Sequence, residues 1–493
     1  MGEVVFQTRS PWRQWGDAIV SRYALSWWRL PLLLLVAGAL LFGPLFLLRG
    51  VRLVALMGVG IVGIVAAAVA FSHPHAALIA ALFLIFSGLD LLLPGPVTIA
   101  LMLVILARGC YDTLRGEKFD WGSTTFRVAS AVLLAVVITS ILVAFRPEMA
   151  GIELCRLLLP IGLYLGISQF ATRSSRIVTL VLAIALGKTI ATLLGLREIL
   201  HHGGLIAIVL QRERIAGLGG EANTHAAEVD CILAPFFCVL GRFGGWRRWT
   251  LLPLMLILIG SVILTQSRGG MLVLGLLFVA ILVRSKYGRG VVLLALAGGL
   301  CLLLLMPRSY WVRFVSIAQL NGIVLDRSLQ VRQHVLAGGW RMFLDHPWLG
   351  VGFGNFRVHS PTFMLGGYAA HNSYVEVAAT LGIVGIAAYL VWMWSGLWMA
   401  REAAGSWRRA GNRPDQALAE NIALGLLTFF IVALTLSIEF YIVLWVLLGL
   451  ANAARRCARS AGETLPGGAG MSQLASTARG VADPRDLITR VVR

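Results

Sequence analysis

A histidine stands where a long polar segment meets an apolar helix. His371 is followed by Asn372 and Ser373, residue types that often begin helices, and the sequence turns apolar from Val375. Before it, residues 307–370 are polar, aromatic and glycine-rich, and they form the longest non-membrane stretch ahead of the C-terminal tail. An imidazole can exchange a proton near neutral pH, so we expect the chemistry at this boundary.

The elements that must position this histidine are membrane helices. The chain has 493 residues, of which 58% are hydrophobic and only 13% are charged, whereas soluble domains average about 25% charged residues. Its apolar runs predict an all-α polytopic membrane protein of about 12–14 transmembrane helices. We expect one integral membrane domain over residues 1–493, with residues 307–370 as an external loop and residues 458–493 as a flexible cytoplasmic tail.

The charge distribution predicts the orientation of these helices. The formal net charge is +19, and most of the 42 lysines and arginines fall in alternate connections between apolar runs. The positive-inside rule then places the N-terminus in the cytoplasm and accounts for the charge without nucleic acid. The six cysteines are scattered and lack CxxC spacing, which favours small core residues over metal ligands or disulfides.

Among the basic residues on the predicted outer side, which run against this orientation, we single out three. Arg214 lies in QRERIAGLGGEANTHA, Arg268 in SRGG, and Arg332 in VRQHVL of the external loop. A guanidinium group can engage two phosphate oxygens at once, so a shared external anion site explains all three.

Several of these features, taken in order along the chain, resemble the O-antigen ligase and O-antigen polymerase superfamily. They are SRGG at Arg268, Arg332 followed after three residues by Leu336, DHPWLGVGFGNF at 345–356, and His371-Asn372 followed by Gly382-x-x-Gly385. We expect Gly382 and Gly385 to let a neighbouring helix approach closely. The resemblance is close from about Arg214 to Tyr389, and elsewhere it extends only to the presence of several membrane-spanning segments.

The resemblance implies a metal-independent glycosyltransferase without a cofactor. Arg332, Arg268 and, on a looser match, Arg214 would hold the diphosphate of an undecaprenyl-linked glycan donor, and His371 would act on the acceptor hydroxyl. The acceptor would be a glycan or lipid A–core, in contact with membrane lipid, on the periplasmic face of the inner membrane. The sequence also offers no Asp/Glu cluster on the predicted outer side that could hold a metal.

Other interpretations stay open. A polymerase of O-antigen or exopolysaccharide repeat units, or a protein O-glycosylating enzyme, would use the same donor chemistry. A transporter or flippase is favoured by the intramembrane charges Glu153, Arg156 and Lys188, although polar residues gather at the outer rim instead of the midplane. The GVGFGN sequence follows no predicted strand, so we interpret it as a loop turn and not a nucleotide site.

Overall fold

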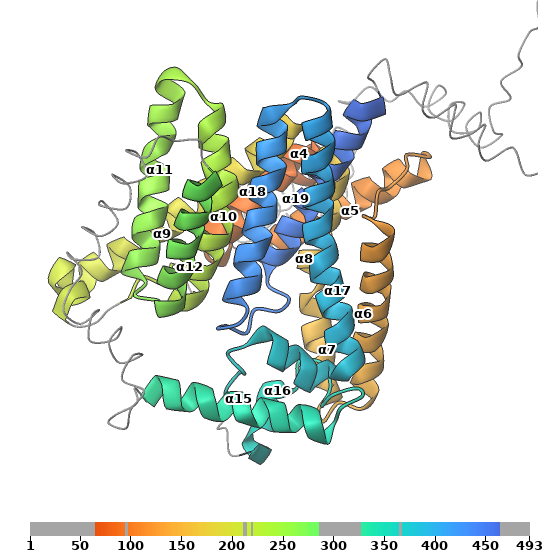
Figure 1. Ribbon diagram of the computed structural model, residues 1–493, viewed down its shortest axis with the longest axis vertical. Coiled ribbons are helices and arrows are strands. Elements are labelled where there is room, and N and C mark those ends of the chain that lie inside the picture. The colour runs from red at the N-terminus through yellow and green to blue at the C-terminus, as the bar shows by residue number, and fades with distance from the viewer. Residues whose placement is uncertain are drawn as a thin grey trace, which may run out of the picture.

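The computed structural model describes residues 65–93, 97–210, 214–217, 220–284, 327–363 and 367–463. Within these residues every regular element is a helix. Eight helices are long and apolar enough to cross a membrane, or nine if the bent pair Val65–Ser72 and Pro74–Ser87 is one span. The prediction of an all-α polytopic membrane protein is therefore confirmed (Figure 1).

After Val65–Ser72, the structure describes sixteen helical elements along the chain. In order they are α4 (Pro74–Ser87), η1 (Leu89–Leu92), α5 (Val97–Leu114), α6 (Thr124–Leu142), α7 (Pro147–Arg156), α8 (Leu158–Phe170), α9 (Ser174–Leu210), α10 (Ala222–Arg242), α11 (Gly245–Leu264), α12 (Arg268–Arg284), α15 (Arg327–Asp345), α16 (Phe356–His359), η2 (Ser360–Phe363), α17 (Ser373–Arg409), α18 (Arg413–Val432) and α19 (Ile442–Glu463).

Some predicted segments lie outside the described residues. These include three apolar runs counted among the expected membrane helices (30–48, 291–306 and most of 53–71), the loop residues 307–326 and 364–366, and residues 464–493 of the expected tail. The described part of the expected loop contains α15, α16 and η2, and α19 extends to Glu463, beyond the predicted start of the tail.

The long helix α17 is the centre of the bundle. It packs against α6, α18 and α19, and its Tyr389 and Trp392 are fully buried. Gly396 lets α19 approach, since a β-carbon there would lie 2.1 Å from the Cδ2 atom of Leu448. By contrast, α6 keeps Val128, Leu134 and other apolar side chains exposed, as expected of a surface that faces lipid.

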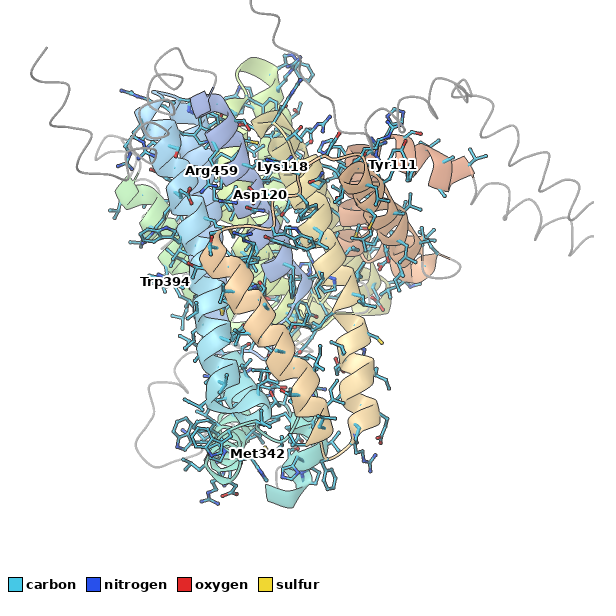
Figure 2. All side chains as sticks on the ribbon, turned by 90° about the vertical axis from the view of Figure 1, so that its right-hand side faces the viewer. Tyr111, Lys118, Asp120, Met342, Trp394 and Arg459 are labelled. Atoms are coloured by element: carbon cyan, nitrogen blue, oxygen red, sulfur yellow. The ribbon has the colours of Figure 1, made fainter. Side chains whose placement is uncertain are left out.

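The two ends of the bundle differ in charge and in what covers them. One end carries Lys118, Asp120 and Arg459, and the other carries Met342 on α15 (Figure 2). At the first end Arg455 is buried and donates to both carboxylate oxygens of Asp120 at 2.6 and 2.8 Å. At the second end α15 runs across the direction of the spanning helices (Figure 1).

The helix α17 is broken near its beginning, where a loop fits into it. Gly382 has φ 68° and ψ −167°, and a β-carbon there would lie 2.2 Å from the carbonyl oxygen of Trp348. The amide of Ile383 donates to the carbonyl of Pro347 at 2.7 Å, and Val351 and Gly352 donate to carbonyls of α17. Only glycine fits this arrangement. We predicted that Gly382 lets a neighbouring helix approach closely. The element that approaches it is instead the loop of residues 347–352.

Candidate active site

His371 lies immediately before α17 in a strained backbone conformation. Its φ is 52°, in the left-handed region that few residues other than glycine occupy, although histidine and asparagine are enriched there. The next residue, Asn372, caps the helix by accepting hydrogen bonds from the amides of Tyr374 and Val375 at 3.0 and 3.1 Å. The prediction that a helix begins after His371 is confirmed, and the turn sets the direction of the imidazole.

The first residues of α17 are fixed by the connection between α18 and α19. The amide of Ser373 donates to the carbonyl of Ala433 at 2.8 Å, and its hydroxyl donates to the carbonyl of Leu436 at 2.8 Å. Asn372 donates from Nδ2 to the carbonyl of Leu434 at 3.1 Å. The position of His371 therefore depends on residues 433–438, which lie more than sixty residues later in the sequence.

The same connection meets the segments that carry two of the predicted arginines. Arg268 begins α12, and a β-carbon at the following Gly269 would lie 3.1 Å from Oγ1 of Thr435. Arg214 donates from Nε to the carbonyl of Thr265, in the turn before α12, at 2.7 Å. Its Nη2 atom donates to Oδ1 of Asn223 at 2.6 Å. Arg214 and Arg268 thus lie at the same end of the bundle as His371 (Figure 1).

The third arginine, Arg332, lies on α15 at the same end of the bundle (Figure 1). Val335 and Met342 of α15 are buried with Val351 and Phe356 in a small apolar cluster of their own. Gly339 permits the close contact, since a β-carbon there would lie 2.8 Å from Val375 of α17. Arg332 lies on the same helix, one turn before Leu336. We call Arg214, Arg268 and Arg332 the arginine rim.

The protonation of His371 links it to the arginine rim. The imidazole is half-buried, and burial lowers its pKa below the ordinary 6.5 because the charged form loses solvation. The positive charges of Arg332 and Arg357 lower the pKa further, while Glu221 raises it. His371 is therefore neutral at pH 7, the form in which an imidazole accepts a proton.

A polar cavity of about 800 Å³ adjoins the rim, with walls from α4, α7, α9, α10, α17 and the loop before α19. Glu221 and Arg357, whose charges shift the pKa of His371, also line this cavity. Its carboxylates, which define what we call the carboxylate cavity, are Asp90, Glu153, Glu221, Glu228, Glu376 and Glu439.

Two ion pairs neutralise part of the carboxylate cavity. Glu153 pairs with Arg156, and Lys188 of α9 pairs with Glu228 of α10. The charged residues Glu153, Arg156 and Lys188, which favoured a transporter, therefore line this cavity. Glu439 differs from the paired carboxylates, because its buried Oε2 atom has no hydrogen-bond partner among the described residues.

The glycine-rich sequence 350–355 shapes the approach to this cavity. Gly350, Gly352 and Gly354 have φ values of 67°, 99° and 67°. A β-carbon at Gly352 would lie 2.5 Å from the Cα atom of Ala144, and one at Gly354 would lie 2.5 Å from Cγ of Glu153. The sequence forms a turn packed on α6 and α7, as its interpretation as a loop predicted.

Asn355 completes this turn. Its side chain is fully buried, accepts from the amide of Arg146 at 2.8 Å and donates to the carbonyl of the same residue at 3.2 Å. The turn thus holds Arg357, two residues later, beside the cavity.

The remaining motif residues have structural surroundings. Gly385 packs on α6, where a β-carbon would lie 3.4 Å from Val136. Leu336 is 40% exposed and lies outside the apolar cluster of α15. Neither residue reaches the rim through a contact described here.

Three residues beside His371 were missed by the sequence interpretation: Glu221, Arg357 and Glu376. Glu376 accepts a hydrogen bond from the amide of Ala370 at 3.2 Å and so holds the residue before His371. Arg357 follows GVGFGN by two residues and Glu221 lies within GLGGEAN, so the motifs could have indicated both. The carboxylates gather from distant parts of the sequence, which is why no acidic cluster was visible in it.

Among the described residues, no group of three or more His, Cys, Asp or Glu has an arrangement suited to a metal ion.

Comparison with known families supports this picture. Residues 253–390 match the family model described as O-Antigen ligase. This segment is similar to the O-antigen ligase family. It runs from within α11 into α17, so Arg268, Arg332 and His371 belong to it, whereas Arg214 precedes it. The resemblance to the O-antigen ligase and polymerase superfamily is confirmed, and no curated protein matches the chain.

Proposed function

We propose that the protein is a membrane glycosyltransferase that moves a glycan from an undecaprenyl-diphosphate donor to an acceptor hydroxyl. The observation that carries the proposal is the convergence of neutral His371 with three arginine-bearing segments at one end of a bundle with similarity to the O-antigen ligase family. As the bond between sugar and diphosphate breaks, negative charge grows on the leaving phosphate. Guanidinium groups that hold those oxygens stabilise the transition state.

His371 acts on the other substrate. Its neutral imidazole takes the proton of the acceptor hydroxyl as the oxygen attacks the anomeric carbon. The bond from carbon to the diphosphate oxygen breaks, and polyprenyl diphosphate leaves. The positive charge formed on His371 is adjacent to Glu221, which favours the protonated imidazole. Neither step requires a metal or another cofactor.

The acceptor distinguishes a ligase from a polymerase. We propose a ligase-like enzyme acting on lipid A–core, because both motifs of the ligase pattern are intact around Arg332 and His371. Purified protein should be incubated with one lipid-linked donor and with three acceptors offered separately: lipid A–core, a second lipid-linked repeat and an unglycosylated protein. Product on lipid A–core supports the ligase, and elongated lipid-linked glycan supports the polymerase. No transfer to any of the three would contradict the proposal.

We further propose that the rim faces the periplasm of the inner membrane. The opposite end carries the basic residues Arg247, Arg248, Arg401, Arg408 and Arg409, which is the asymmetry of a cytoplasmic face. Reporter fusions at Gly411 should indicate cytoplasm, and fusions at Gly367, in the segment before His371, should indicate the periplasm. A cytoplasmic report at Gly367 would put the rim on the wrong side for the lipid-linked donor.

A further inference from the structure

The helix α15 presents three faces along its length. Val335, Gly339 and Met342 form the face buried against α17 and the loop 351–356. A second face carries the exposed polar residues Gln330, His334 and Arg341. The third face is apolar and exposed, and none of the described helices covers it.

The uncovered face is a regular stripe of large apolar side chains. Leu336, Trp340 and Leu344 recur every four residues, which places them on one side of a helix. Their exposed fractions are 40%, 51% and 58%. Trp348, in the turn that follows the helix, is 73% exposed. A contiguous apolar surface of this kind normally contacts a membrane or another protein.

The position of α15 points to lipid. The helix runs across the direction of the spanning helices at the end of the bundle (Figure 1), as a helix lying in the plane of a membrane interface does. Trp348 lies level with the break in α17, because its neighbour Pro347 accepts the hydrogen bond from Ile383. Ile383 and Val384 are 45% and 43% exposed on a membrane-spanning helix. Trp348, at the end of the stripe, therefore adjoins an exposed apolar part of α17.

We propose that α15 is an interfacial helix whose stripe of Leu336, Trp340 and Leu344, together with Trp348, is immersed in the lipid leaflet at this end of the bundle. Tryptophan favours this depth, since its ring is largely apolar and its N–H group can reach water or headgroups. The polar residues Gln330, His334 and Arg341 face away from the lipid. Leu336 thus acquires a role as an anchor.

The proposal has a consequence for Arg332, which rests on the proposed function. Arg332 lies one turn before Leu336 on α15, so immersion of the stripe holds its guanidinium group at the level of the lipid headgroups. The diphosphate of a polyprenyl-linked donor lies at the same level, because its hydrocarbon chain is in the bilayer. The interfacial helix would then set the depth at which the donor's diphosphate meets the arginine rim.

Photo-crosslinking in native membranes tests the proposal without relying on enzymatic activity. A benzophenone amino acid replaces Trp340 or Leu344 in two variants, and His334 or Arg341 in two matched variants on the polar face of the same helix. All four positions are exposed, so the fold tolerates the substitution. After irradiation, intact-mass analysis counts phospholipid adducts, and gel electrophoresis reports crosslinks to protein.

We expect phospholipid adducts at positions 340 and 344 to exceed those at 334 and 341 by about tenfold, the contrast between burial in lipid and exposure to water. Equal adduct yields at all four positions would overturn the proposal. So would a crosslink from 340 or 344 to a second copy of the chain or to another protein, because a protein partner would then cover the stripe. Loss of glycosyl transfer in a variant that still forms lipid adducts would bear on the proposed function alone.

Discussion

The arginine rim and the carboxylate cavity adjoin one another but hold their charges in different ways. In the cavity, Glu153 and Glu228 are paired with basic residues from helices of the bundle. On the rim, Arg214 donates to a backbone carbonyl and a neutral side chain. The cavity therefore mixes acidic and basic side chains, whereas the rim gathers three guanidinium groups from three segments of the chain.

Under the proposed function, the two regions would take different parts of one substrate. The anionic diphosphate would bind at the rim, away from the carboxyl groups that line the cavity. His371 stands at the junction, where Arg332 from the rim and Glu221 from the cavity wall have opposite effects on its pKa. The predictions below test this division of roles.

The largest effect is expected at the junction. His371→Asn should lower the turnover number by about 10²–10⁴-fold, the usual contribution of a general base. Asparagine tolerates the left-handed backbone of residue 371 better than alanine does, so the fold should be retained. Turnover is measured at saturating donor with membrane protein levels matched. An Asn variant with near-native turnover would make His371 a structural residue.

The next largest effect should appear on the rim. Arg332→Ala and Arg268→Ala should each lower kcat/KM by about 10²-fold or more, and lysine should restore only part of it, because an ammonium group cannot engage two phosphate oxygens as a planar guanidinium does. Arg341→Ala, on the polar face of α15, is the matched control and should be neutral. Full activity of both lysine variants would show that these arginines anchor the protein at the interface and do not bind diphosphate.

A smaller effect is expected in the cavity. Burial and the neighbouring Glu376 raise the pKa of the Glu439 carboxyl, so Glu439→Gln removes little negative charge and keeps the shape of the side chain. Donor affinity should therefore change by no more than about fivefold. Titration with the lipid-linked donor measures it. Marked weakening of donor binding would mean that the diphosphate lies in the cavity and that the division is wrong.

The smallest effect is a shift in pH dependence. A base is active when deprotonated, so the rate should fall as pH decreases through the pKa of His371. Arg332→Gln removes a charge that lowers this pKa, so the acid limb of the profile should move to higher pH. Glu221→Gln removes a charge that raises it, so the limb should move to lower pH. Arg332→Lys keeps the charge and should leave the limb in place. Shifts in the same direction for both Gln variants would exclude His371 as the titrating group.

The sequence predicted what depends on composition and local pattern. Hydropathy indicated the membrane helices, and the N-cap pattern located the start of α17 at Ser373. The ordered motifs indicated Arg268, Arg332 and His371, which the structure places at one end of the bundle. These features depend on residues close together in the chain.

What the sequence could not show depends on long-range contacts. Residues 433–438 carry no motif, yet they bond to Asn372 and Ser373. Glu439 and Glu153 lie far apart in the chain and meet only across the cavity. The role of Gly382 was misjudged because a pattern of small residues indicates close approach without saying which element approaches.

The break at Gly382 also bears on how the protein is made. Until residues 347–352 dock, the amide of Ile383 and two carbonyls of α17 lack their partners, at a cost of about 1–3 kcal/mol for each such group away from water. Synthesis proceeds from the N-terminus, so the loop emerges from the ribosome before the helix that it completes. When α17 enters the bilayer, residues 347–352, which supply its missing hydrogen-bond partners, have already been synthesised. A circular permutant that began at Ser373 would reverse this order, and α17 would have to be inserted with its break unsatisfied.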